Sequence, residues 1–69
     1  MDNQQLRSLK ERLGMGDYQL NYKTGVRLGV IEDFFSGRLD EPSPKDRQRI
    51  EEALMQAART RVTKTARES

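Results

Sequence analysis

The stretch "TGVRLGVIEDFFSG", residues 24 to 37, decides the fold. A helix advances by about 100° per residue, so this stretch would gather its large apolar side chains on one arc that faces a core. That arc holds Val30, Ile31, Phe34 and Phe35. The opposite arc mixes an apolar residue, a glycine, two acids and a hydroxyl, namely Leu28, Gly29, Glu32, Asp33 and Ser36. We therefore expect a helix over residues 27 to 36 with two unlike faces, closed by Gly37.

The amino-terminal part of the chain predicts two more helices. Three leucines recur at helical spacing before a glycine, which predicts a first helix of about three turns that Gly14 ends. A second helix is expected to begin at Gly16 or Asp17, because either residue suits an N-cap. It ends at Gly25, since a left-handed backbone there suits only glycine or asparagine. Leu6, Leu9, Leu13 and Leu20 are the expected core residues of these two helices.

A fourth helix is predicted after a loop that contains two prolines. Ser43 caps it and Pro44 occupies its first turn, with an acid three residues after the cap. Its inward stripe consists of Ile50, Ala53, Leu54 and Ala57. No strand-like alternation is present, so the sequence predicts an all-α fold.

Length and composition narrow the possibilities further. The chain has 69 residues and neither cysteine nor histidine, so no disulfide or structural zinc site is expected. A domain of this size buries only about 60% of the surface of its unfolded chain. We therefore expect a single domain supported by helix packing or by partner subunits. Because the sequence contains neither a long apolar run nor a signal peptide, a cytoplasmic location is expected.

Charge is unevenly distributed although the net charge is only +2. Residues 59 to 69 carry four cations and one acid, whereas residues 1 to 58 carry nine cations and ten acids. Apolar content falls after residue 58 and β-branched threonines appear. The sequence thus predicts a domain over residues 1 to 58 and a frayed basic tail over residues 59 to 69.

Catalysis is not expected from this composition. The chain lacks a histidine for acid-base work, a cysteine nucleophile and a glycine motif for phosphates. The carboxylate pairs Asp40-Glu41 and Glu51-Glu52 are adjacent in sequence, so they do not converge on one point of a helix. We expect a protein that is not an enzyme and that has no cofactor or metal.

A helix, a glycine turn, a short helix, a "TGV" turn and a second short helix follow one another, which is the order of a helix-turn-helix. Residues 9 to 38, "LKERLGMGDYQLNYKTGVRLGVIEDFFSGR", resemble the lambda-repressor/Cro-like family of phage and bacterial regulators. Residues 41 to 54, "EPSPKDRQRIEEAL", resemble that family's fourth helix. The resemblance implies a small four- to five-helix domain with a central helix-turn-helix. Its key positions are Leu20, Gly25, Val26, Ile31, Phe34, Gly37 and, in the fourth helix, Pro42, Ile50, Ala53 and Leu54.

The resemblance also implies how such a chain would bind double-stranded DNA. Residues 27 to 36 would be a recognition helix whose exposed arc enters the major groove. Base contacts are then expected from Arg27, Leu28, Gly29 and Asp33. Phosphate contacts are expected from Tyr18, Ser36, Arg38 and Lys45. A homodimer would read a palindromic operator, with Met55, Ala58 and Val62 as the expected dimer interface.

Four positions depart from the family pattern. Asp17 stands where the family commonly has a glutamine that holds a phosphate, and an anion there would repel it. Asn21 replaces a small alanine, and Arg27 replaces a capping serine or threonine. Phe35 replaces a glutamate that often pairs with a base at the position of Lys10.

Two other interpretations stay open. The Glu32-Asp33 pair and Asp17 would suit a protein-interaction module on the same fold, such as an antirepressor, an antiactivator or an accessory factor. Its third-helix face would then meet another regulatory protein. Alternatively, the basic tail alone could bind DNA without sequence preference.

Overall fold

A computed structural model describes residues 1 to 68, with side chains described for residues 1 to 60. Over this range the chain forms four helices and no strand, which confirms the predicted all-α fold. The helices are α1 (Asn3–Leu13), α2 (Asp17–Thr24), α3 (Leu28–Ser36) and α4 (Pro44–Glu68).

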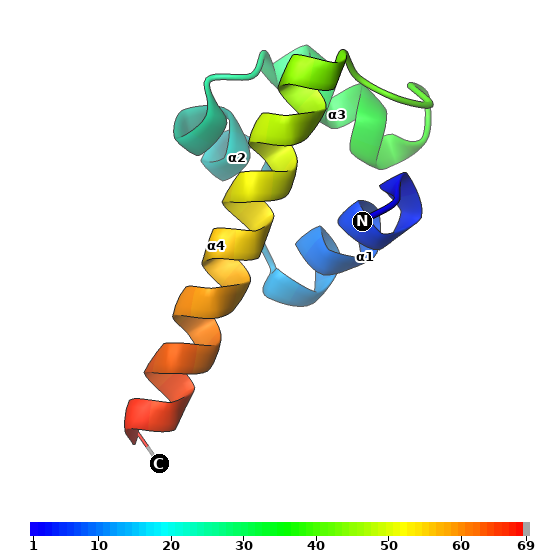
Figure 1. Cartoon of the computed structure of the whole chain (residues 1–69). Coiled ribbons are helices and arrows are strands. Elements are labelled where there is room, and N and C mark those ends of the chain that lie inside the picture. Colours follow the sequence, from blue (N-terminus) through cyan, green and yellow to red (C-terminus); the bar gives the residue numbers. More distant parts are fainter. Residues whose placement is uncertain (69) are drawn as a thin grey trace.

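The longest helix, α4, organises the molecule (Figure 1). Helices α1 and α2 both pack on α4, and α3 packs on α2. The shorter helices surround the first half of α4, while its carboxyl-terminal half continues beyond them (Figure 1). The molecule is accordingly elongated, with extents of 39, 22 and 18 Å.

One core joins all four helices. Its buried members are Leu6, Met15, Leu20, Val26, Ile31, Phe34, Ile50 and Leu54. Full burial of each such side chain contributes about 1.5 to 3 kcal/mol to the free energy of unfolding. The inward stripes predicted for the four helices are confirmed, and Met15 joins them from the loop before α2. Partly buried side chains surround this core, namely Leu9, Leu13, Val30, Phe35, Leu39, Ala53 and Ala57.

The first three helices end at glycines, as predicted. Gly14, Gly25 and Gly37 have φ values of 67°, 75° and 88°. In this left-handed region a side chain would strain the backbone. Gly25 lies in the short loop that joins α2 to α3, so the placement of these two helices depends on it.

Two helix starts show side-chain caps. Asp2 Oδ1 accepts a hydrogen bond from the Gln5 N–H at 2.7 Å, and Gln5 Oε1 accepts one from the Asp2 N–H at 2.9 Å. This capping box starts α1 at Asn3, which is earlier than the apolar periodicity indicates. At the start of α4 the Asp46 N–H donates to Ser43 Oγ at 3.3 Å, as the sequence predicts.

Helix α4 continues to Glu68, through the stretch for which the sequence predicts a frayed basic tail. Residues 59 to 68 contain no glycine or proline that would end a helix. Arginine, lysine, alanine and glutamate have high helix propensity. Each threonine costs the helix only about 0.5 kcal/mol relative to alanine. Local propensity therefore continues the helix where the apolar stripe fades.

Gly25→Ala is expected to lower the free energy of unfolding by about 1 to 2 kcal/mol. A Cβ at Gly25 would meet no atom within 4 Å, so the cost arises from its φ of +75° alone. Urea denaturation followed by far-UV circular dichroism measures the change. Gly29→Ala is the control, since Gly29 has equal space and no positive φ. Equal losses in both variants would contradict a backbone origin.

Candidate functional site

The surface of α3 that faces away from the core is the candidate site. Four of its residues, Gly29, Glu32, Asp33 and Ser36, are exposed, and Leu28 is half-buried. We call these five residues the α3 outer face. The sequence predicts this division of α3 into a core arc and an exposed arc, and the structure confirms it.

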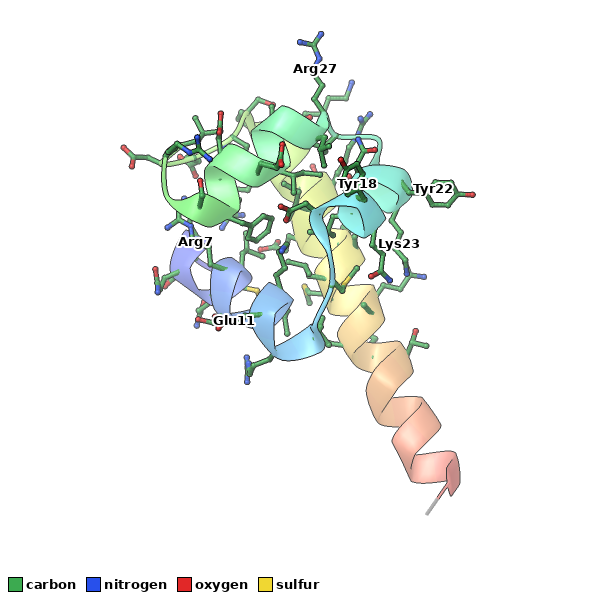
Figure 2. The ribbon with its side chains drawn as sticks, turned by 180° about the vertical axis from the view of Figure 1, so that it is seen from behind. Arg7, Glu11, Tyr18, Tyr22, Lys23 and Arg27 are labelled. Carbon is green, nitrogen blue, oxygen red and sulfur yellow. The ribbon has the colours of Figure 1, made fainter. Side chains whose placement is uncertain are left out.

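Arg27 begins this face. It is the N-cap residue of α3, with φ −56° and ψ 136°, and its side chain makes no capping hydrogen bond. The side chain is exposed and projects outward from the turn (Figure 2). Among the described residues it has no ion-pair or hydrogen-bond partner. Its guanidinium is therefore available to an external anion or acceptor.

The turn between α2 and α3 is held by two polar side chains. Asn21 Nδ2 donates to the Val26 carbonyl at 2.6 Å, and Thr24 Oγ1 accepts from the Val26 N–H at 3.1 Å. Thr24 Oγ1 also donates to the Leu20 carbonyl at 2.6 Å. Asn21 thus serves the turn by satisfying the carbonyl of the buried Val26. These bonds fix where α3 begins.

A short polar network covers the other end of the outer face. Arg38 Nε lies 3.7 Å from Asp33 Oδ1 and donates to Ser36 Oγ at 3.2 Å. Arg38 and Asp33 are 75% and 52% exposed, so their attraction is weak and easily exchanged for another partner. Three residues predicted to contact DNA are therefore neighbours here, and a cation lies beside Asp33.

Arg7 anchors the end of α3 from α1, a role that the sequence does not indicate. Its Nε donates to the Phe34 carbonyl at 2.9 Å, and its Nη2 donates to the Leu39 carbonyl at 3.2 Å. The guanidinium carbon also lies 4.7 Å from the centroid of the Phe34 ring. The Phe34 carbonyl also accepts from the Gly37 N–H at 3.3 Å, so Arg7 adds a second donor at the end of α3 and links α1 to the loop at Leu39.

Lys10 neutralises Asp17 at the start of α2. Lys10 Nζ lies 2.9 Å from Asp17 Oδ1 and 5.0 Å from the centroid of the Phe35 ring. The two charged side chains are only 17% and 33% exposed, so solvent screens this pair less than an open surface pair. Asp17 of α2 and Phe35 of α3 are thus both in contact with one lysine of α1. The negative charge expected to repel phosphate has a cation beside it.

The outer side of α2 presents two tyrosines. Tyr18 and Tyr22 are 75% and 91% exposed, and their spacing of four residues places them on the same side of the helix. Tyr22 projects from α2 into solvent (Figure 2). A phosphate contact is expected for Tyr18 and none for Tyr22, although their four-residue spacing places the two side by side.

The remaining predicted residues lie on α4. Lys45 is exposed in the first turn of α4. The start of α4 lies at the end of the molecule that also holds α3 (Figure 1). Met55 is 40% exposed and Ala58 is half-buried, both on the part of α4 that precedes its extension. The side chain of Val62 lies outside the described residues. The expected dimer interface therefore has one exposed apolar side chain within the described range.

Comparison with family models, with curated protein sequences and with solved structures found no match for this chain in any of the three. None of the helices in the described part of the chain is long and apolar enough to cross a membrane. Nor do the described residues group three or more histidine, cysteine, aspartate or glutamate side chains where they could hold a metal ion.

Proposed function

We propose that the chain is a sequence-specific DNA-binding transcription regulator of the lambda-repressor or Cro type, as found in phages and mobile elements. The observation that carries this proposal is α3 itself. Its core arc is buried through Ile31 and Phe34, while its outer face is turned to solvent beside Arg27, whose side chain has no partner among the described residues. A short helix held in this way can enter a DNA major groove about 12 Å wide. Such a regulator would act in the cytoplasm.

Roles follow from the chemistry of each side chain at this face. Arg27 would donate to a guanine or a phosphate, and Leu28 would rest on a thymine methyl. Gly29 would let the backbone approach the bases, and Asp33 would accept from a cytosine amino group. Phosphates would be held by hydroxyls and cations around this face, namely Tyr18, Ser36, Arg38 and Lys45.

A homodimer would double the contact area on a palindromic operator. One short recognition helix offers few contacts, and a twofold partner places a second helix about one DNA turn, roughly 34 Å, away. Met55, Ala58 and Val62 on α4 are the proposed dimer interface. Sedimentation equilibrium of wild type and Met55→Lys would test this part of the proposal, since a lysine at an apolar interface should favour the monomer.

The second candidate is a protein-interaction module that uses the same face. Glu32 and Asp33 are exposed, and this acidity favours a basic regulatory protein as the partner. Two observations reduce the support for this second candidate. Asp17 is paired with Lys10 and Asp33 lies beside Arg38, so both acids already have a cation close by. An antirepressor, an antiactivator or an accessory factor would work in this way.

Electrophoretic mobility shifts distinguish the two candidates. The probe is duplex DNA from upstream of the chain's own coding region, compared with random duplex across a range of salt. A preference for the upstream duplex together with a steep salt dependence supports the regulator. Failure to retain any duplex at about 50 mM salt, with co-purification of a basic regulator, supports the protein-interaction module.

Gly29→Ala is expected to separate stability from DNA binding. Alanine should raise the free energy of unfolding by about 0.5 kcal/mol, because it is a better helix former and its Cβ meets no atom within 4 Å. The Kd for the preferred duplex should nevertheless rise about tenfold, since the added methyl group lies between the helix and the bases. Urea denaturation and mobility shifts measure the two effects. A more stable variant with unchanged affinity would remove Gly29 from the proposed contact.

A further inference from the structure

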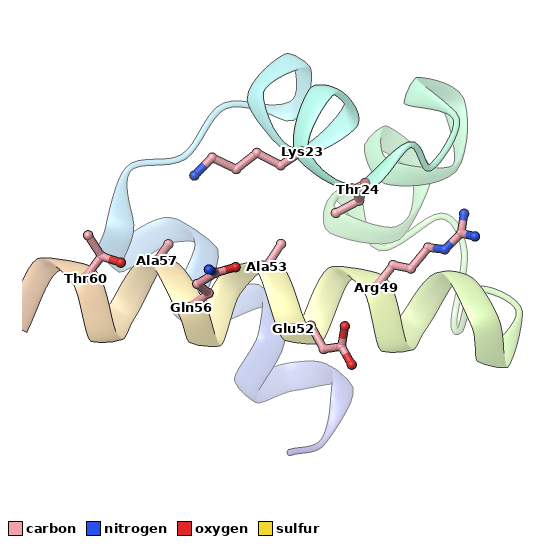
Figure 3. Close-up of a pocket in the computed structure, with 8 residues that line it drawn as sticks. All are labelled: Lys23, Thr24, Arg49, Glu52, Ala53, Gln56, Ala57 and Thr60. Carbon is pink, nitrogen blue, oxygen red and sulfur yellow. The ribbon is translucent and has the colours of Figure 1, made fainter.

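A second surface lies between the end of α2 and the middle of α4. It is a groove with a volume of about 640 Å³ (Figure 3). None of its lining residues belongs to the α3 outer face or to the proposed DNA contacts. The lining consists of Lys23, Thr24, Arg49, Glu52, Ala53, Gln56, Ala57 and Thr60.

The floor of this groove is apolar and shallow. Ala53 and Ala57 lie one helical turn apart on α4, and both are half-buried. Their methyl groups fill little of the space between α2 and α4, so the backbone of another segment can approach closely. Apolar side chains that cover this floor would stabilise a complex by burying apolar surface, whereas a phosphate group would bury none.

Two cations stand on the walls. Lys23 comes from α2 and extends along the groove, while Arg49 comes from α4 and stands at the opposite end (Figure 3). Both are exposed, and within the described part of the chain neither forms an ion pair. Glu52 is the only acid among the lining residues. It points away from α2 (Figure 3) and accepts from Gln48 Nε2 at 3.4 Å.

We propose that this groove binds an acidic segment of a partner protein. Carboxylates of the segment would pair with Lys23 and Arg49, and its apolar side chains would cover Ala53 and Ala57. Complementary charge would steer the encounter and set the register, and the apolar floor would hold the segment in place. A DNA backbone would satisfy the two cations and leave the alanines uncovered, which favours the peptide.

The test uses a synthetic peptide of about 15 residues built from alanine, leucine and glutamate, with its glutamates on one helical face. The peptide is titrated into the full chain labelled with ¹⁵N, and amide chemical shifts are recorded. We expect the largest shifts at Thr24, Ala53 and Ala57. A matched peptide with glutamine in place of glutamate should bind about tenfold more weakly, because it lacks the charges that the cations pair with.

Charge-reversal variants test the two groove cations, and a third variant outside the groove is the control. Lys23→Glu and Arg49→Glu should each raise the Kd of the acidic peptide about tenfold or more, whereas Lys45→Glu, outside the groove, should change it less than about twofold. All three side chains are exposed, so circular dichroism should show intact helices. Peptide shifts outside the groove, or equal weakening by Lys45→Glu, would overturn the proposal. Groove shifts with random duplex and none with the peptide would overturn it too, and would assign the cations to DNA. Because neither groove cation, Lys23 nor Arg49, is a proposed DNA contact, failure here leaves the regulator function separately testable.

Discussion

Ile31→Ala is expected to lower the free energy of unfolding by about 3 kcal/mol. Ile31 is fully buried in α3 and belongs to the same core cluster as Leu20 of α2. Removal of its side chain loses apolar burial and leaves a cavity between the two helices. Small domains commonly have only about 5 kcal/mol of stability in total, so this variant should lose most of it. The midpoint of thermal unfolding should fall by roughly 12 to 24 °C.

Val30→Ala is the matched control for this prediction. Val30 is the neighbouring residue on the same helix but is only partly buried, so its truncation should cost about 1 kcal/mol. Thermal and urea denaturation, followed by far-UV circular dichroism, measure both variants. Similar losses at the two positions would show that Ile31 does not join α2 to α3 as the structure describes.

Arg27→Ala is expected to raise the Kd for the preferred duplex about 10- to 100-fold while leaving the free energy of unfolding unchanged. The side chain makes no capping hydrogen bond, so its removal costs the fold little. In the bound state it would supply a charge-assisted contact at the start of α3. Fluorescence anisotropy with preferred and random duplexes measures the change and its sequence dependence.

Arg49→Ala is the control for Arg27, because Arg49 is also an exposed arginine without an ion pair among the described residues. It should leave the duplex Kd unchanged within about twofold. Loss of affinity for preferred and random duplexes alike would make Arg27 a phosphate contact rather than a base contact. Unchanged affinity in Arg27→Ala, together with unchanged specificity in Asp33→Ala, would remove the assigned readers altogether.

Local sequence was enough to predict that four helices form and which of their faces are buried, because caps and periodicity depend on neighbouring residues. It did not predict the start of α1 at Asn3 or the continuation of α4 to Glu68. Gly25 ends α2 through its own left-handed backbone. Ser43 caps α4 because its hydroxyl accepts from the N–H of Asp46, three residues later in the chain. Ile31 and Phe34 face the core because of helical periodicity alone. The division of α3 into two faces, which defines the candidate site, follows from the same periodicity.

The hydrogen-bond and ion-pair partners of polar side chains were harder to predict. Periodicity indicates which side of a helix is exposed to solvent, but not which side chains meet there. Arg7 bonds to the Phe34 carbonyl 27 residues away, and this depends on how α1 crosses the end of α3. Lys10 meets both Asp17 and Phe35 because α1, α2 and α3 converge around it. The groove between α2 and α4 likewise exists only once these helices are packed.

The proposed regulator function requires the α3 outer face to be the surface that binds DNA. Titration of the ¹⁵N-labelled chain with the preferred duplex, followed by amide chemical shifts, tests it most directly. We expect the largest shifts over residues 27 to 33, with smaller ones at Tyr18 and Lys45. Shifts confined to residues 59 to 68, or identical patterns with preferred and random duplex, would contradict it.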